Sequence, residues 1–234
     1  MNAHLFLAAT AALIAFAFAL STLERWLDRR APHEAAWSAA LFLFAAASLA
    51  LLAGVAFGWN AVSFRTFYLF GAIVNVPYLA LGTVWLLGGE RWGKPATRAV
   101  NAFACFSVGI MAVAPLTGPI PSDTLPQGSD VFGPLPRVLA AGGSGLASVV
   151  IVGGAVWSAT RLVRHRSTRR LAAANALIAL GTLVLGAGGV LNSVVNEMDG
   201  FAISLVAGIT LLFAGFLLTN RPRRTALRAV TEAA

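Results

Sequence analysis

The sequence predicts an all-α integral membrane protein: a seven-transmembrane-helix bundle with its N-terminus outside and its C-terminus in the cytoplasm. Of its 234 residues, 58% are hydrophobic and 11% are charged, whereas soluble domains are about 45–50% apolar and about a quarter charged. Seven apolar stretches each reach the length of about 20 residues that a helix needs to cross a bilayer. Basic residues gather in alternate connections between these stretches, which is typical of cytoplasmic loops.

Each stretch is expected to be a helix, because an open strand in lipid would leave its backbone N–H and C=O groups without partners. The connections are too short to hold another domain. We therefore expect one transmembrane domain over residues 1–220 and a short basic tail over 221–234. The predicted spans are Leu5–Leu23, Ala36–Trp59, Thr66–Leu87, Thr97–Leu116, Val138–Thr160, Leu171–Asn192 and Phe201–Thr219.

The distribution of charge predicts the orientation. All but two of the 17 lysines and arginines fall in the first, third and fifth connections or in the tail, and the exceptions are Arg65 and Arg137. Since basic residues collect on the cytoplasmic side, the N-terminus is expected outside. No basic residue precedes the first span, which favours an uncleaved helix over a signal peptide. Arginine-rich usage with a single lysine, Lys94, indicates a bacterial cytoplasmic membrane protein.

The most basic segment, "RLVRHRSTRR", is expected to be the cytoplasmic turn between the fifth and sixth spans. Its natural partner is the anionic headgroup layer, which attracts each nearby basic residue by about 1 kcal/mol. A membrane or cytoplasmic protein partner is the alternative, and nucleic acid is not expected because the segment has no aromatic residue to stack on a base. The expected basic surface comprises Arg161, Arg164, Arg166, Arg169, Arg170, Arg221, Arg223 and Arg224.

The sequence indicates no catalytic or cofactor chemistry. It contains no cluster of His, Cys, Asp and Glu with metal-ligand spacing, no nucleophile elbow and no phosphate-binding loop. The last span has no lysine to form a Schiff base with retinal, and all three histidines lie at or beyond the ends of the expected helices, where they could not ligate haem. We therefore expect neither an enzyme nor a bound metal or cofactor. No ionisable residue is expected at mid-depth, which disfavours proton or sodium coupling.

The third span, "FRTFYLFGAIVNVPYLALGTVWLL", is the most polar. Its proline lacks an N–H, so the helix should be distorted near Ala72 and Ile73, one turn earlier. An amide beside such a distortion could bind a ligand or line a pore; alternatively, it only bonds a neighbouring helix. The candidate ligand- or pore-facing residues are Arg65, Tyr68, Asn75 and Pro77.

Polar residues also gather at the expected outer ends of the helices. We hypothesise an outer polar cap in which Arg65 pairs with Glu197 or Asp199; solvated, unpaired charges are the alternative. The Pro-rich segment between the fourth and fifth spans is either a lid or a simple connection. The glycine-rich fifth and sixth spans favour tight internal packing over a homo-oligomer interface. The cap candidates are Asn60, Asn192, Asn196, Glu197 and Asp199.

Two functions fit these observations. The first is a non-enzymatic, receptor-like or partner-binding membrane protein that recognises a small apolar or amphipathic ligand, or another membrane protein. The second is an uncoupled transporter or channel for a small neutral solute, with Asn75 and Pro77 at its midpoint. We place transport second because the span offers few polar groups on the cytoplasmic side of Asn75.

Overall fold

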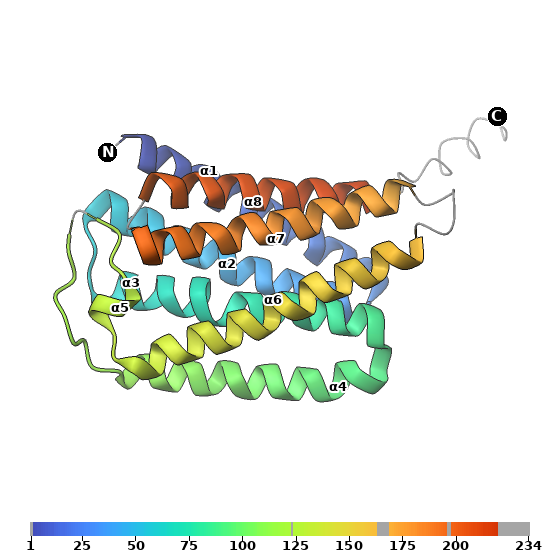
Figure 1. The fold of residues 1–234 in the computed structure, drawn as a ribbon, viewed down its shortest axis with the longest axis horizontal. Helices are drawn as coiled ribbons and strands as arrows, with labels where there is room; N and C mark the ends of the chain where they lie inside the picture. Colours follow the sequence, from blue (N-terminus) through green and yellow to red (C-terminus); the bar gives the residue numbers. More distant parts are fainter. Residues whose placement is uncertain (1, 123, 163–168, 196–197, 220–234) are drawn as a thin grey trace.

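The computed structural model describes residues 2–122, 124–162, 169–195 and 198–219. Within these ranges the chain is almost entirely helical, and the sole β pairing is an isolated bridge between Leu116 and Phe132. The long helices lie side by side along the long axis of the molecule (Figure 1). The all-α prediction is confirmed. The elements are α1 (Asn2–Arg29), α2 (Pro32–Phe57), α3 (Ala61–Phe67), η1 (Tyr68–Val74), α4 (Asn75–Val113), α5 (Gly128–Val131), α6 (Pro134–Leu162), α7 (Arg169–Val195) and α8 (Met198–Thr219).

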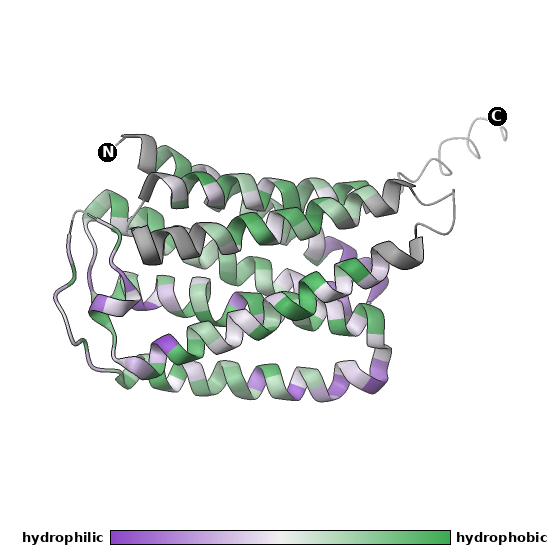
Figure 2. Ribbon diagram, in the orientation of Figure 1, coloured by the Kyte–Doolittle hydropathy of each residue, from purple (hydrophilic) through white to green (hydrophobic). Residues whose placement is uncertain are grey.

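Within the described ranges, five helical segments are long and apolar enough to cross a membrane, which gives the chain the character of a multi-pass membrane protein. Apolar residues follow the helices along their whole length, and hydrophilic residues gather toward the ends of the bundle (Figure 2). Many large apolar side chains point outward, such as those of Phe6, Leu13 and Leu146. Such a surface suits lipid rather than water. The five segments are Leu5–Arg29, Pro32–Phe57, Ala61–Val113, Pro134–Ser158 and Gly200–Leu218.

The segment Ala61–Val113 contains the third expected span and all but the last three residues of the fourth. Its backbone leaves the helical conformation at Gly89, where φ is +59° and ψ is −155°. There the chain doubles back, so that residues 61–88 and 90–113 form two neighbouring arms (Figure 1). Glycine permits this positive φ because it has no Cβ. We call these stretches the first arm and the second arm.

The connection between α1 and α2 is shorter than the sequence predicts. Helix α1 continues to Arg29, past the expected end of the span at Leu23, and α2 already begins at Pro32. The charged run "ERWLDRR" therefore marks the end of the apolar stretch and not the end of the helix. Proline is well suited to the first position of α2, since its missing N–H would have no partner there. As a result, Glu34 lies inside the first turn of α2.

The first arm is distorted where the sequence predicts. Residues Tyr68–Val74 form a π-helix, just before Pro77. In a π-helix, hydrogen bonds join residues five apart, and Pro77, five residues after Ala72, has no N–H to donate to the Ala72 carbonyl. The hydroxyl of Ser144 on α6 donates to that carbonyl at 2.5 Å. The predicted distortion is confirmed, and a neighbouring helix supplies the missing hydrogen bond.

The segment that follows the second arm packs onto one end of the bundle. The side chains of Leu125, Val131 and Phe132 are buried there. The Phe132 ring stacks on Phe64 of α3, with 5.2 Å between ring centroids. The backbone N–H of Thr117 also donates to the Val131 carbonyl at 2.9 Å. This segment, residues 114–122 and 124–133, therefore covers the end of the bundle at which α2 ends and α3 begins (Figure 1). We call it the covering segment.

Candidate functional site

Arg65 caps a helix end. Its guanidinium donates to the carbonyls of Met111, Ala112 and Ala114, at 3.2 Å to Ala112 and 2.7 Å to Ala114. These carbonyls lie at the end of the second arm, where a helix has no internal donors left. The positive charge also complements the negative end of the helix dipole. Arg65 thereby fastens together the ends of the two arms that lie away from Gly89.

Tyr68 faces the covering segment rather than a cavity. Its ring lies 5.1 Å from the ring of Phe132 and 5.8 Å from that of Phe64, measured between centroids. A Cβ atom at Gly128 would overlap the Tyr68 ring, so only glycine allows this close approach. The contact is therefore a packing contact between the first arm and the covering segment.

Asn75 and Pro77 are both buried in the first arm. The Asn75 Oδ1 atom is inaccessible to solvent and has no hydrogen-bond partner among the described residues. Its neighbours on the helix surface, Gly71 and Gly82, approach Ala47 and Trp37 of α2. A buried amide oxygen without a partner costs about 1–3 kcal/mol. The four predicted ligand-facing residues thus lie along one arm, but no hydrogen bond between them is found among the described residues.

The outer cap is only partly described. Asn60 is the N-cap of α3: its Oδ1 accepts from the N–H groups of Val62 and Ser63, and the Ser63 hydroxyl completes the capping box. It also borders an open groove of about 450 Å³ at the expected outer end of the bundle. Residues Asn196 and Glu197 lie outside the described residues, and the side chains of Asn192 and Asp199 are not described either. The proposed pairing of Arg65 with Glu197 or Asp199 stays a prediction.

The expected cytoplasmic basic surface also falls largely outside the described part of the chain. Arg164, Arg166, Arg221, Arg223 and Arg224 lie beyond it. The side chains of Arg161, Arg169 and Arg170 are likewise not described, although these residues belong to α6 and α7. Their grouping stays a prediction from the sequence.

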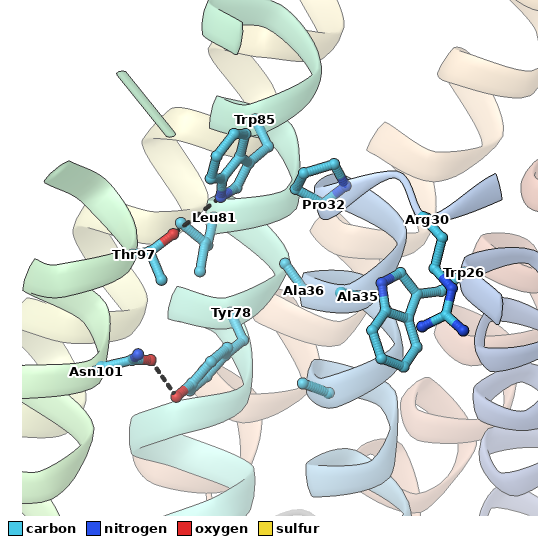
Figure 3. Close-up of a pocket in the computed structure, with 11 residues that line it drawn as sticks. Trp26, Arg30, Pro32, Ala35, Ala36, Tyr78, Leu81, Trp85, Thr97 and Asn101 are labelled. Carbon is cyan, nitrogen blue, oxygen red and sulfur yellow. Dashed lines mark hydrogen bonds between the residues drawn. The ribbon is translucent and has the colours of Figure 1, made fainter. Parts of the chain in front are cut away.

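The structure shows a groove that the sequence analysis did not identify. It has a volume of about 380 Å³ and lies near the end of the bundle where α1 meets α2 and where the two arms join. Figure 3 shows residues of α1 at one side and residues of the second arm at the other, with α2 and the first arm between them. Its lining is mainly apolar and consists of Trp26, Arg30, Pro32, Ala35, Ala36, Ala39, Tyr78, Leu81, Trp85, Thr97 and Asn101.

Two hydrogen bonds between the arms fix one side of this groove. The Tyr78 hydroxyl donates to Oδ1 of Asn101 at 2.8 Å. The Trp85 indole N–H donates to the Thr97 hydroxyl at 2.9 Å (Figure 3). The Asn101 Nδ2 group has no acceptor among the described residues and remains able to donate to a ligand. Aromatic rings with placed polar tips are typical of sites for amphipathic molecules.

Arg30 lies at the opposite side of the groove in an unusual conformation. Its φ is +53°, the sole positive value at a non-glycine position in the described chain. The left-handed region costs an L-residue about 1–2 kcal/mol. Its N–H closes α1 by donating to the Trp26 carbonyl at 2.7 Å. The Arg30 guanidinium carbon lies 5.5 Å from the centre of the Trp26 ring, within the range of a cation–π interaction.

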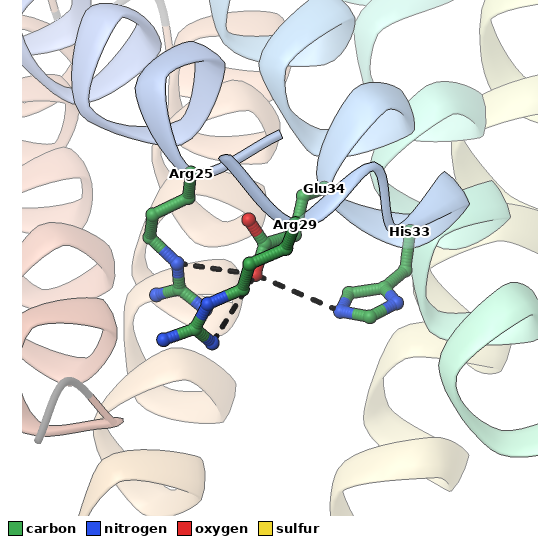
Figure 4. A network of polar contacts seen from close by, with 4 residues as sticks. All are labelled: Arg25, Arg29, His33 and Glu34. Carbon is green, nitrogen blue, oxygen red and sulfur yellow. Dashed lines mark hydrogen bonds and ion pairs between the residues drawn. The ribbon is translucent and has the colours of Figure 1, made fainter. Parts of the chain in front are cut away.

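A buried ion pair supports the same turn. Glu34 is 1% exposed, and its Oε1 atom lies 2.7 Å from Nη2 of Arg25. Arg29 and His33 lie farther from the same oxygen, at 3.8 and 3.9 Å (Figure 4). The sequence analysis missed this acid because the segment "PHEAAW" resembles a loop that precedes the span. The only signal available was an acid two residues after a proline that can begin a helix.

The described residues contain no cluster of three or more His, Cys, Asp or Glu side chains that could hold a metal ion. The candidate site is the groove formed by α1, α2 and both arms. Comparison with known proteins adds nothing to this geometry: no family model, curated protein or solved structure matches the chain.

Proposed function

We propose that the chain is a seven-span protein of a bacterial cytoplasmic membrane that binds an amphipathic ligand without transforming it chemically. The number of seven spans is reached when the two arms are counted as separate spans and α7 is added to the five apolar segments. The reversal at Gly89 supports this, since each arm exceeds the about 20 residues required to cross a bilayer. Helix α7 has 27 residues, with an apolar stretch at Ala176–Ala187.

The described basic residues support an orientation with the groove near the cytoplasm. The α1–α2 turn and the reversal of the arms lie at one end of the bundle, and the start of α3 lies at the other (Figure 1). Because basic residues gather on the cytoplasmic side, the end with the reversal is the inner one. Its described basic residues are Arg25, Arg29, Arg30, Arg91, Lys94 and Arg98, whereas Arg65 and Arg137 lie at the outer end.

The groove is the observation that carries the binding proposal. Its volume of about 380 Å³ falls in the range of small-molecule sites, about 300–1,000 Å³. Its surface combines alanines and leucine with the polar tips of Tyr78 and Asn101. That combination suits a ligand with an apolar body and a polar head. No catalytic group is needed for such binding.

Photolabelling tests this proposal. The purified full-length protein, in phosphatidylcholine nanodiscs, is irradiated with a neutral monoacylglycerol that carries a diazirine in its acyl chain. We expect labelled peptides from residues 26–39 and 78–101, which line the groove. The substitution Ala39→Phe should fill the groove and reduce that labelling severalfold.

A matched variant controls for nonspecific effects. Ala53→Phe places the same side chain on the same helix, but in the outer groove, and should leave inner-groove labelling unchanged. Uniform labelling of all lipid-facing helices, or equal effects of the two substitutions, would contradict the binding proposal.

A facilitator of small neutral solutes is the second candidate, and Asn75 favours it. A buried amide oxygen without a partner, next to a π-helix and a proline, resembles the uncharged polar sites in broken transporter helices. Solvent does not reach this atom in the structure, so transport requires a second conformation. Liposome swelling with small neutral solutes tests this proposal. Swelling that Asn75→Leu abolishes would support transport, and no swelling with any solute would reject it.

A further inference from the structure

The three arginines of the α1–α2 turn differ in their partners. Arg25 and Arg29 both lie within ion-pair distance of Glu34. Arg30 has no carboxylate within that distance among the described residues, and its exposed guanidinium lies over Trp26. One positive charge of this turn is therefore available to an external anion, and it lines the groove.

The backbone at Arg30 strengthens this argument. A non-glycine residue with positive φ is uncommon, and such strain often persists where a side chain has a particular task. Glycine would end α1 without strain, as it commonly does at this position of a helix end. Instead the chain places an arginine there, with its side chain beside the ring of Trp26 at the edge of the groove.

The polar groups of the groove lie at two depths. Tyr78 is seven residues from Trp85 along the first arm, which corresponds to about 10 Å along the helix axis. Trp85 lies close to the reversal, and therefore close to the inner membrane surface. An anion at Arg30 would lie at headgroup depth, and the free Nδ2 of Asn101, beside Tyr78, would lie near the start of the hydrocarbon.

We infer that the groove binds an anionic phospholipid of the cytoplasmic leaflet. Its phosphate pairs with Arg30, an ester carbonyl accepts from Asn101, and an acyl chain lies against Ala35, Ala39 and Leu81. Charge complementarity selects this occupant over a neutral lipid, because the unpaired arginine is the single charged group of the lining. This inference names the ligand class of the proposed function and rests on it.

Competition against the photolabel tests the ligand class. Short-chain phosphatidylglycerol and phosphatidylcholine are titrated against the neutral diazirine probe, with inorganic phosphate in a parallel series. Phosphatidylglycerol should displace the probe at an about fivefold lower concentration than phosphatidylcholine, as one added favourable charge contact implies. Inorganic phosphate should not displace it, because it lacks the acyl chain.

Two variants locate the effect. Arg30→Gln should make the two lipids equal competitors, while the neutral probe continues to label the groove and so reports that the groove is intact. Arg91→Gln is the matched control: its guanidinium also lies over a neighbouring tryptophan, Trp92, but it does not line the groove. The Arg91→Gln variant should keep the preference for phosphatidylglycerol over phosphatidylcholine.

The inference and the proposed function fail differently. Equal competition by the two lipids in the wild-type protein, or equal loss of the preference in both variants, overturns the anionic phospholipid and leaves the groove as a binding site. Displacement by inorganic phosphate assigns the site to a free anion and also overturns the inference. Absence of groove labelling by the neutral probe rejects the proposed function itself.

Discussion

Arg25 of α1 donates two hydrogen bonds to a single carboxylate oxygen of Glu34 on α2, from Nε at 3.1 Å and from Nη2 at 2.7 Å. The second carboxylate oxygen is buried and has no hydrogen-bond partner in the described part of the chain. The Arg25 guanidinium also lies 4.4 Å from the centre of the Phe216 ring on α8. One arginine thus connects three helices at the end of the bundle that carries the groove.

Removing this arginine should destabilise the protein strongly. Arg25→Leu leaves a carboxylate that is 1% exposed without its close partner, and breaking a buried ion pair in this way costs about 3–5 kcal/mol. Because Arg25 itself is 17% exposed, we expect a value near the lower limit, about 3 kcal/mol. Circular dichroism during SDS-induced unfolding measures it.

A double substitution tests the physical reason. Arg25→Leu with Glu34→Leu removes both charges and should recover part of the lost stability. The exposed pair Glu90–Lys94 serves as the control. Lys94→Gln should leave the unfolding midpoint unchanged, since exposed ion pairs contribute little. A double variant less stable than Arg25→Leu alone would contradict this account.

The hydroxyl of Ser144 should stabilise the first arm only because Pro77 is present. Ser144→Ala removes the hydrogen bond from α6 to the Ala72 carbonyl, and hydrogen bonds between membrane helices are worth about 0.6 kcal/mol on average. In a Pro77→Ala background, a backbone N–H becomes available one turn away, so the same substitution should cost less. Unfolding of the four variants in a double-mutant cycle measures the coupling, and an equal cost in both backgrounds would reject it.

Arg65 should stabilise the protein through its three carbonyl acceptors. Arg65→Gln is expected to lower the free energy of unfolding by about 2 kcal/mol, the magnitude of a hydrogen bond to a charged group. Arg65→Lys should retain only part of this stabilisation, because lysine lacks the planar guanidinium group that can donate to several acceptors at once. Unfolding of Glu197→Gln and Asp199→Asn tests the alternative partners. If either variant loses as much stability as Arg65→Gln, the outer polar cap is the better explanation.

The helices could be predicted from the sequence for two reasons. The apolar stretches are long enough to cross a bilayer, and a helix pairs all backbone N–H and C=O groups of such a stretch within lipid. The distortion near Ala72 could also be predicted, since the missing N–H of Pro77 is visible in the chain itself. The partners of Arg65 could not be predicted, because they are backbone carbonyls, which every residue type carries. Glu34 was missed because hydropathy locates the lipid-exposed stretch and not the full helix.

The groove could not be predicted for a different reason. Tyr78 and Asn101 meet only because Gly89 reverses the chain, and the residues of α1 and α2 reach them only through the packing of the whole bundle. In the sequence, Asn75 is the conspicuous candidate because an amide is unusual within an apolar span. Asn101 was not predicted as a site residue, because an amide near the start of an expected span is common.

Cysteine labelling tests the seven-span topology. The sequence has one cysteine, Cys105, which is exposed, so a Cys105→Ser protein provides the background. A membrane-impermeant maleimide should label Ser129→Cys, in α5 of the covering segment, from outside intact cells. It should label Glu90→Cys, at the reversal, only after the cells are permeabilised. Labelling of both from the same side would show that the arms do not cross the membrane, and exchanged accessibility would reverse the orientation, so that the groove would open toward the outer leaflet.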